Sequence, residues 1–157
     1  MAIVAPRLQQ LLDEHHICYE TLPHATDFTA QETSEHTGTP GRAFAKAVVV
    51  ETGGREVMLV LPADHAVEFA RLEMVLQERR VDLVREGRLR RIFRDCDRGA
   101  IPPFGNLYGL EVLATPRLLR NATLTFNAGS HEMAIRLSAG DYEDLVRPRT
   151  EEFSSHI

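Results

Sequence analysis

Hydrophobic residues near the N-terminus recur with the period of an α-helix. An amphipathic helix that begins at Pro6 is predicted, because the i, i+3, i+4, i+7 spacing is found at Leu8, Leu11, Leu12 and His15. A second helix is predicted from the capping-box form of residues 29–32 (Thr-Ala-Gln-Glu), and Gly38 with Pro40 must end it. Later helices are predicted over roughly 65–78, with Asp64 as the cap, around the apolar positions of 89–96, and from Ser138-Ala139-Gly140-Asp141 onward.

Runs of apolar and β-branched residues predict strands between these helices. Ala45–Glu51 and Glu56–Leu61 flank Thr52-Gly53-Gly54-Arg55, which is typical of a hairpin turn. Further short strands are predicted at 17–22, 80–84, 108–113, 122–126 and 133–137. Residues 127–131 (Asn-Ala-Gly-Ser-His) are predicted to form a turn between the last two strands.

The strands are too many and too locally connected for a doubly wound parallel sheet. They predict an α+β fold in a single domain, with a mixed, largely antiparallel, barrel-like sheet and surrounding helices. We expect the domain to span residues 1–148, because Pro148 closes the predicted elements, and residues 149–157 to form a flexible C-terminal tail.

Composition is consistent with this fold and narrows the class of protein. A chain of 157 residues with 43% hydrophobic and 26% charged residues fits one soluble domain. The N-terminus lacks the features of a signal peptide, no run is long enough to cross a bilayer, and Cys18 and Cys96 form neither a disulfide framework nor a metal-binding pair. We therefore expect a cytoplasmic protein with reduced cysteines.

The basic residues are distributed unusually. Of the 18 Lys and Arg residues, Lys46 is the single lysine, and it lies inside an apolar run. A lysine kept in so arginine-rich a chain indicates that this position needs a compact ammonium group, which guanidinium cannot replace. The alternative is that this lysine remained by chance at the edge of the surface. The net charge of −5 argues against a general nucleic-acid coat, yet the segment Arg79–Arg98 holds eight arginines against four acidic residues. This stripe would bind phosphates, or it is a solvated helix face.

Three segments carry candidate chemistry. Both faces of the strand around Lys46 are apolar, so an interior ammonium would need a partner or a ligand, unless the side chain reaches out to water. The loop Gly99–Gly105 contains adjacent prolines between glycines. Such a loop would present backbone amides and carbonyls to a ligand in a rigid arrangement, or it merely ends a helix. In the predicted turn, His131 is a candidate ligand contact or acid–base residue, and His24 precedes the capped helix where it could face a pocket.

Other chemistries lack their motifs. No spacing of His, Cys or carboxylates reads as a metal site, and the phosphate-loop and dinucleotide fingerprints are absent. We expect no metal and no cofactor.

These segments, in this order along the chain, resemble one known family. His24 and Thr29-Ala30-Gln31-Glu32 are followed by Ala45–Val50, then by Gly99–Gly105, then by Asn127–His131. The arrangement is similar to the YbaK / prolyl-tRNA-synthetase-associated editing domains and covers residues from about 6 to 148. Members of that family hydrolyse mischarged aminoacyl-tRNAs, and the length of this chain is similar to that of the free-standing members.

The resemblance implies roles for individual residues. Lys46 matches the family's conserved lysine and would contact the terminal adenosine or the aminoacyl ester. The loop Gly99, Ala100, Ile101, Pro102 and Pro103 matches the family's Gly-x-x-x-Pro motif, whose backbone would position the aminoacyl group and polarise the ester carbonyl. Gly129, Ser130 and His131 would lie near the same pocket, and we expect His24 and Thr29 to contact substrate as well. Water would attack the ester without a protein nucleophile.

The function implied is that of a free-standing deacylase of mischarged tRNA, with tRNA(Pro) carrying Ala, Cys, Ser or Thr as the expected substrate. The tRNA acceptor end would be the partner, held in part by Arg79–Arg98. Two alternatives remain: a non-catalytic aminoacyl-tRNA or nucleotide-binding module of the same fold, and a small-molecule lyase that forms a Schiff base on Lys46.

Overall fold

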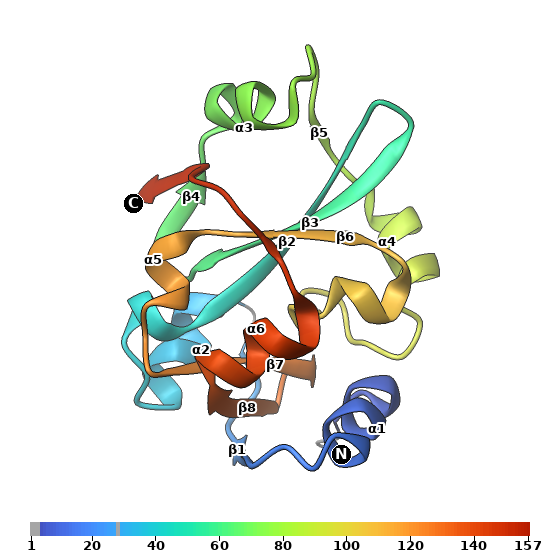
Figure 1. Cartoon of the computed structure of the whole chain (residues 1–157). Helices are drawn as coiled ribbons and strands as arrows, with labels where there is room; N and C mark the ends of the chain where they lie inside the picture. The colour runs from blue at the N-terminus through green and yellow to red at the C-terminus, as the bar shows by residue number, and fades with distance from the viewer. Residues whose placement is uncertain (1–3, 28) are drawn as a thin grey trace.

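The structure is a computed structural model that describes residues 4–27 and 29–157. Helices are interspersed among the strands along the chain, and α1 and α3 lie at opposite ends of the molecule (Figure 1). The α-helices are α1 (Pro6–Glu14), α2 (Ala30–His36), α3 (Phe69–Leu76), α4 (Glu86–Ile92), α5 (Pro116–Leu119) and α6 (Ala139–Val146). Two 3₁₀ helices are η1 (Gly41–Ala43) and η2 (Gly105–Tyr108).

The strands form three sheets. They are β1 (Tyr19–Pro23), β2 (Ala45–Thr52), β3 (Arg55–Pro62), β4 (His65–Val67), β5 (Asp82–Leu83), β6 (Glu111–Ala114), β7 (Thr123–Ser130), β8 (Met133–Ser138), β9 (Arg149–Thr150) and β10 (Ser154–His156). Their orders are β1-β8-β7, β5-β2-β3-β6-β9 and β10-β4. The β3–β6 and β6–β9 pairs are parallel and the other pairs antiparallel. The predicted α+β class with a mixed, mostly antiparallel sheet is confirmed.

Local sequence signals placed several elements correctly. The β2–β3 hairpin turns at Gly53 and Gly54, as the sequence predicts. Thr29 is the N-cap of α2, where its hydroxyl accepts a hydrogen bond from the Glu32 N–H at 3.1 Å. Ser138 caps α6 in the same way. Each feature depends on residues within a few positions of one another, so the sequence pattern specifies it directly.

The β2–β3 hairpin separates two hydrophobic cores. Side chains alternate along β2, so Ala45 and Val49 pack into the larger core, which also includes α1, α6 and sheet β1-β8-β7. Val50 packs on the other side into a smaller core with α3. Because a strand buried on both faces reads as a continuous apolar run, the pattern around Lys46 predicted the strand but not which face Lys46 occupies.

The predicted flexible tail at residues 149–157 is wrong. β9 pairs with β6, β10 pairs with β4, and the Phe153 side chain between them is fully buried in the smaller core. The main-chain N–H of Ile157 also donates to the Asp64 carbonyl at 2.9 Å. Strands this short carry little periodicity, and their partners lie far away in the sequence, so the local pattern gave no warning.

Other boundaries also differ from the predictions. His65–Val67 is β4 instead of helix, so α3 begins only at Phe69, with Glu68 at the N-cap position in place of Asp64. Residues 127–130 are not a turn: they continue β7 through a bulge, and Ser130 pairs with Met133. Gly129 makes this course feasible because its φ is 104°, a conformation that favours glycine.

The described helices include none with the length and apolar character needed to cross a bilayer.

Candidate functional site

The Gly99–Pro103 loop and the end of β7 are joined through their backbones. The Asp97 N–H donates to the Gly129 carbonyl at 2.7 Å, and the Gly129 N–H donates to the Ala100 carbonyl at 3.0 Å. A side chain at Gly129 would collide with the N-terminal segment, since an added Cβ would lie 2.7 Å from the Ala5 Cβ. Two of the segments singled out in the sequence therefore form one rigid unit.

The loop leaves two backbone donors available. Pro102 and Pro103 have no N–H, and the Ala100 N–H already donates to the Asp97 carbonyl at 3.1 Å. Among the described residues, the N–H groups of Gly99 and Ile101 have no recorded hydrogen bond. Both prolines are buried, and the Tyr142 hydroxyl donates to the Pro103 carbonyl at 2.7 Å, which fixes the loop from beneath. Such an arrangement presents donors without reorganisation.

Ser130 and His131 have separate partners. The Ser130 hydroxyl is buried and accepts a hydrogen bond from the Glu132 N–H at 3.1 Å. The His131 main-chain N–H donates to the Asp97 carboxylate at 3.3 Å, and its ring Nε2 contacts the Arg98 carbonyl. His131 therefore contacts the segment that leads into the Gly99 loop, and these contacts do not form a Ser–His catalytic pair.

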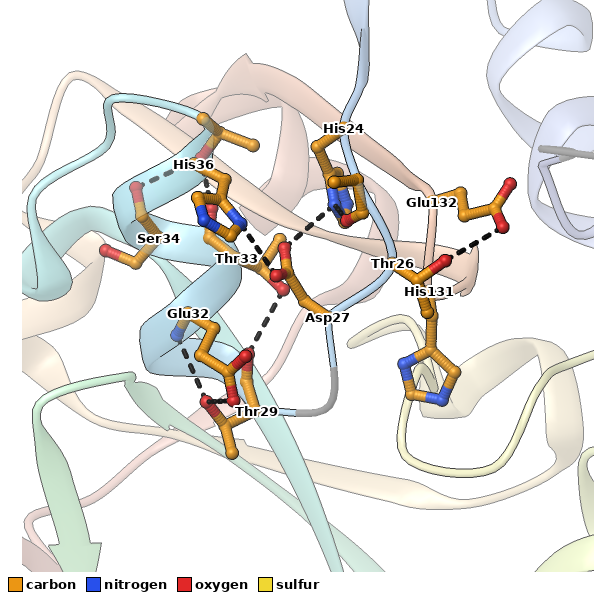
Figure 2. A network of polar contacts seen from close by, with 12 residues as sticks. His24, Thr26, Asp27, Thr29, Glu32, Thr33, Ser34, His36, His131 and Glu132 are labelled. Carbon is orange, nitrogen blue, oxygen red and sulfur yellow. Dashed lines mark hydrogen bonds and ion pairs between the residues drawn. The ribbon is translucent and has the colours of Figure 1, made fainter.

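The segment that carries His24 lies against the β7–β8 turn. The His24 N–H donates to the Glu132 carbonyl at 3.0 Å, and the Asp27 N–H donates to the His131 carbonyl at 3.2 Å. The Thr26 hydroxyl donates to the Glu132 carboxylate at 3.0 Å. Figure 2 shows this pairing, with the His131 ring pointing away from His24. The structure thus gathers His24, His131 and the Gly99 loop around one turn.

A buried carboxylate holds two imidazoles beside this turn. Asp27 is 1% exposed, and its two carboxylate oxygens lie 3.0 Å from His24 Nδ1 and 2.6 Å from His36 Nδ1 (Figure 2). His24 Nδ1 is also 2.7 Å from the Ala25 carbonyl oxygen. In the neutral tautomer that carries its proton on Nδ1, Nε2 of His24 is an acceptor, and it is buried without a recorded partner among the described residues. The sequence analysis singled out neither Asp27 nor His36, because nothing local marks their pairing.

Thr29, predicted to contact substrate, has a structural role in the described contacts. Its hydroxyl caps α2 and also donates to the Glu32 carboxylate at 3.1 Å, while its carbonyl accepts the Thr33 hydroxyl at 3.1 Å (Figure 2). These contacts hold the start of α2 next to Asp27.

Lys46 is half-buried near the start of β2. Its ammonium donates to the Ala63 carbonyl at 3.3 Å. Burial lowers the pKa of Lys46 below its usual value, and the nearby charge of Asp64 partly opposes that shift. A half-buried ammonium held by a neutral carbonyl retains hydrogen-bonding capacity for a ligand.

β7 runs beside the start of β2 at this point. Phe44 and Thr125 form a parallel bridge, and Lys46 and Asn127 each lie two residues beyond it, on the same side of their strands as the bridged residues. Asn127 is buried, and its Oδ1 has no recorded partner. The recorded polar contacts of the described residues do not link Lys46 directly to Gly99–Pro103 or His131; its part in the same pocket stays a prediction.

The predicted arginine stripe divides into paired and unpaired members. Arg80, Arg88 and Arg98 form ion pairs with Asp82, Glu56 and Glu86 at 2.7, 2.8 and 3.3 Å. Arg79, Arg85, Arg90, Arg91 and Arg94 have no carboxylate within ion-pair distance among the described residues. Arg90 and Arg98 line a small cavity together with Gly99 and Ile101, so one end of the stripe borders the loop.

Two other chemistries find no support in the geometry. Cys96 is largely buried, which raises the pKa of its thiol to about 12 and leaves it protonated and unreactive near neutral pH. In the part of the chain that the structure describes, no group of three or more His, Cys, Asp or Glu side chains could hold a metal ion.

Solved structures share the whole fold. A crystal structure of a candidate trans-editing enzyme for prolyl tRNA synthetase has a TM-score of 0.84 at 16% identity, with 99% of each chain covered. The hypothetical protein APE2540 gives 0.83 at 14% identity over 95% of this chain and 99% of that one. A larger candidate signal transduction protein from Marinobacter aquaeolei gives 0.74 at 12% identity, over 94% of this chain and 30% of that one. At these identities the matches show the fold alone.

Sequence comparison gives the family. No curated protein sequence matches significantly. The sequence pattern of the aminoacyl-tRNA editing domain matches residues 24–145, which contain His24, Lys46, the Gly99 loop and His131. The chain belongs to the aminoacyl-tRNA editing domain family.

Proposed function

We propose that this protein is a free-standing deacylase that hydrolyses the ester bond of mischarged tRNA. The proposed substrate is tRNA(Pro) carrying a small amino acid such as Ala, Cys, Ser or Thr. The family assignment and the fold shared with a candidate trans-editing enzyme support this proposal. The observation that carries it is the Gly99–Pro103 loop beside the His131 turn, where the Gly99 and Ile101 N–H groups have no recorded hydrogen-bond partner among the described residues.

The unpaired N–H groups suit the transition state of ester hydrolysis. When water adds to the ester carbonyl, the carbonyl oxygen gains negative charge, and fixed N–H donors at Gly99 and Ile101 would stabilise it. Collapse of the intermediate breaks the bond to the ribose oxygen, which takes up a proton and leaves as the tRNA hydroxyl. Because the ester is already activated, positioning and electrostatic stabilisation are sufficient without a protein nucleophile.

Lys46 would supply the single ammonium group of the pocket. The charge is half-buried, with a neutral carbonyl as its recorded hydrogen-bond partner, so a negatively charged or strongly polar ligand group would improve its environment. In this account it contacts the terminal adenosine or the ester. Arg90, the unpaired arginine that lines the small cavity beside Gly99, would then lie where the tRNA backbone approaches.

A deacylation panel tests the function. The purified protein is mixed with tRNA(Pro) charged separately with Ala, Cys, Ser, Thr and the cognate Pro, and release of the amino acid is followed. We expect faster release from at least one mischarged tRNA than from Pro-tRNA(Pro). Binding of all these tRNAs without release would instead favour the non-catalytic module of the same fold.

Selectivity within the panel should be moderate. A pocket that discriminates by size gains about 1–3 kcal/mol per methylene. We therefore expect related small amino acids to differ by about 10- to 200-fold in deacylation rate. Equal rates for every charged tRNA would contradict a size-selective editing pocket.

A further inference from the structure

Arg136 differs from the other arginines of the chain. All of the other sixteen are exposed, whereas Arg136 on β8 is half-buried. No carboxylate lies within ion-pair distance of it in the described structure. A partly buried cation without a counter-ion is unfavourable, because its hydration is lost and no opposite charge replaces it. The fold nevertheless keeps the Arg136 guanidinium partly buried without a counter-ion among the described residues.

Neutral groups fix the Arg136 guanidinium. Its Nε donates to the Thr125 hydroxyl at 3.1 Å, and one terminal nitrogen donates to the Thr39 hydroxyl at 2.9 Å and to the Thr37 carbonyl at 3.3 Å. The Thr39 and Thr125 hydroxyls are themselves hydrogen-bonded at 3.2 Å. The second terminal nitrogen has no recorded partner, so two N–H donors of a preorganised fork are left over.

Arg136 borders a cavity whose described lining residues include no acidic residue. The cavity is about 340 Å³ and is lined by Gly38, Thr39, Pro40, Arg42, Ala43, Asn121, Ala122, Thr123 and Arg136. Arg42 is exposed, and its guanidinium has no recorded contact. Since one water occupies about 30 Å³ of liquid, the cavity has room for a tetrahedral anion with its waters. Two uncompensated guanidinium groups on one acid-free cavity are the chemistry of phosphate recognition.

One carboxylate lies close enough to matter. Glu20 on β1 is directly opposite Arg136 in the β1–β8 pairing, and both residues line the neighbouring groove. No ion pair joins them among the described residues, because the Arg136 side chain is held toward Thr39. Glu20 would therefore weaken the binding of an anion by charge repulsion, although no ion pair with Arg136 is recorded among the described residues.

We propose that Arg136 and Arg42 form a binding site for a backbone phosphate of the tRNA, an inference that rests on the proposed function and adds a contact outside the ester pocket. The position fits a nucleic acid that continues past the pocket. The Arg136 side chain donates a hydrogen bond to Thr125. Thr125 forms a parallel β-bridge with Phe44, which lies two residues before Lys46. A ribose–phosphate chain whose terminal ester lies near Lys46 would reach this cavity along β7.

Binding of deacylated tRNA(Pro) tests this site without any hydrolysis. Affinity is measured between about 50 and 200 mM salt for the wild type, Arg136→Gln, Arg42→Gln and the control Arg147→Gln, which alters an exposed arginine without a recorded ion pair. We expect both site variants to bind about tenfold more weakly, with a salt slope smaller by about 0.7–0.9, and the control to match the wild type. Glu20→Gln should bind slightly more tightly.

The outcomes separate this site from the deacylase function. Arg42 makes no recorded side-chain contact, so its substitution reports on binding even if Arg136→Gln folds poorly. Unchanged affinity and salt slope in Arg42→Gln and in folded Arg136→Gln would overturn the site, whatever the deacylation panel shows. Stabilisation of the wild type by inorganic phosphate alone, with tRNA affinity independent of Arg136, would mean a small-anion site and would also overturn the proposal.

Discussion

Charged groups are treated in opposite ways at the tip of the β2–β3 hairpin and in the region where α2 and the start of β2 meet β7. The tip contains the larger concavity, about 570 Å³, but its charges are matched: Arg88 pairs with Glu56 and Arg80 with Asp82. In the α2–β7 region, Lys46 and Arg136 are half-buried and bonded to neutral acceptors. If Lys46 and Arg136 act as proposed, partly buried cations without an ion pair mark the site, and the size of the hollow at the tip does not.

Asp27 is the most buried charge of the α2–β7 region, and its removal should have the largest effect on stability. Asp27→Asn keeps the shape but cannot accept hydrogen bonds from both His24 and His36, so we expect a loss of about 1–3 kcal/mol in unfolding free energy. Urea unfolding gives the measurement.

The matched control for Asp27 is Glu35→Gln on α2, since Glu35 is exposed and its side chain has no recorded contact. If Asp27→Asn costs no more than this control, the carboxylate does not organise the two histidines.

Substitution of Arg88 at the hairpin tip should change the stability of the protein only slightly, and the change should depend on pH. The hydrogen bond from Arg88 holds the pKa of Glu56 below its ordinary value of 4.5. A carboxyl group whose pKa is depressed in the folded state contributes stability above its unfolded pKa and loses it as the pH falls through the folded value. Arg88→Gln should therefore be slightly less stable than the wild type at pH 7, and the two should converge in acid.

Thermal unfolding between pH 7 and pH 3 measures this convergence, with the exposed Arg79→Gln as control. Deacylation by Arg88→Gln should stay within about twofold of the wild type, because paired surface charges contribute little. A large loss of activity would place the tip in the functional site and would contradict the contrast between the two regions.

Local chemistry allowed much of the fold to be predicted. The Gly53-Gly54 hairpin and the Thr29 and Ser138 caps are each specified within a few residues. The C-terminal strands could not be predicted in this way, because the burial of Phe153 depends on β4 and β6, which precede it by many residues. Pairing between distant segments follows from the assembled core and leaves no short-range pattern.

The candidate site shows the same division. Gly99, Gly129 and His131 were found because glycines, prolines and an isolated histidine are visible in the sequence, and the structure joins them. Asp27 and Arg136 were missed, since one is an ordinary acidic residue in a loop and the other a single arginine among seventeen. Only their burial and partners distinguish them.

The role of Lys46 is tested most directly by the single-turnover deacylation rate of the wild type, Lys46→Ala and Lys46→Arg on the mischarged tRNA(Pro) that the wild type hydrolyses fastest. If Lys46 provides the ammonium of the ester pocket, both variants should lose at least about 100-fold, the scale of one lost transition-state donor. Arginine should fail despite its charge, because its planar fork differs from a compact ammonium. Folded Lys46→Ala with wild-type activity would contradict the account.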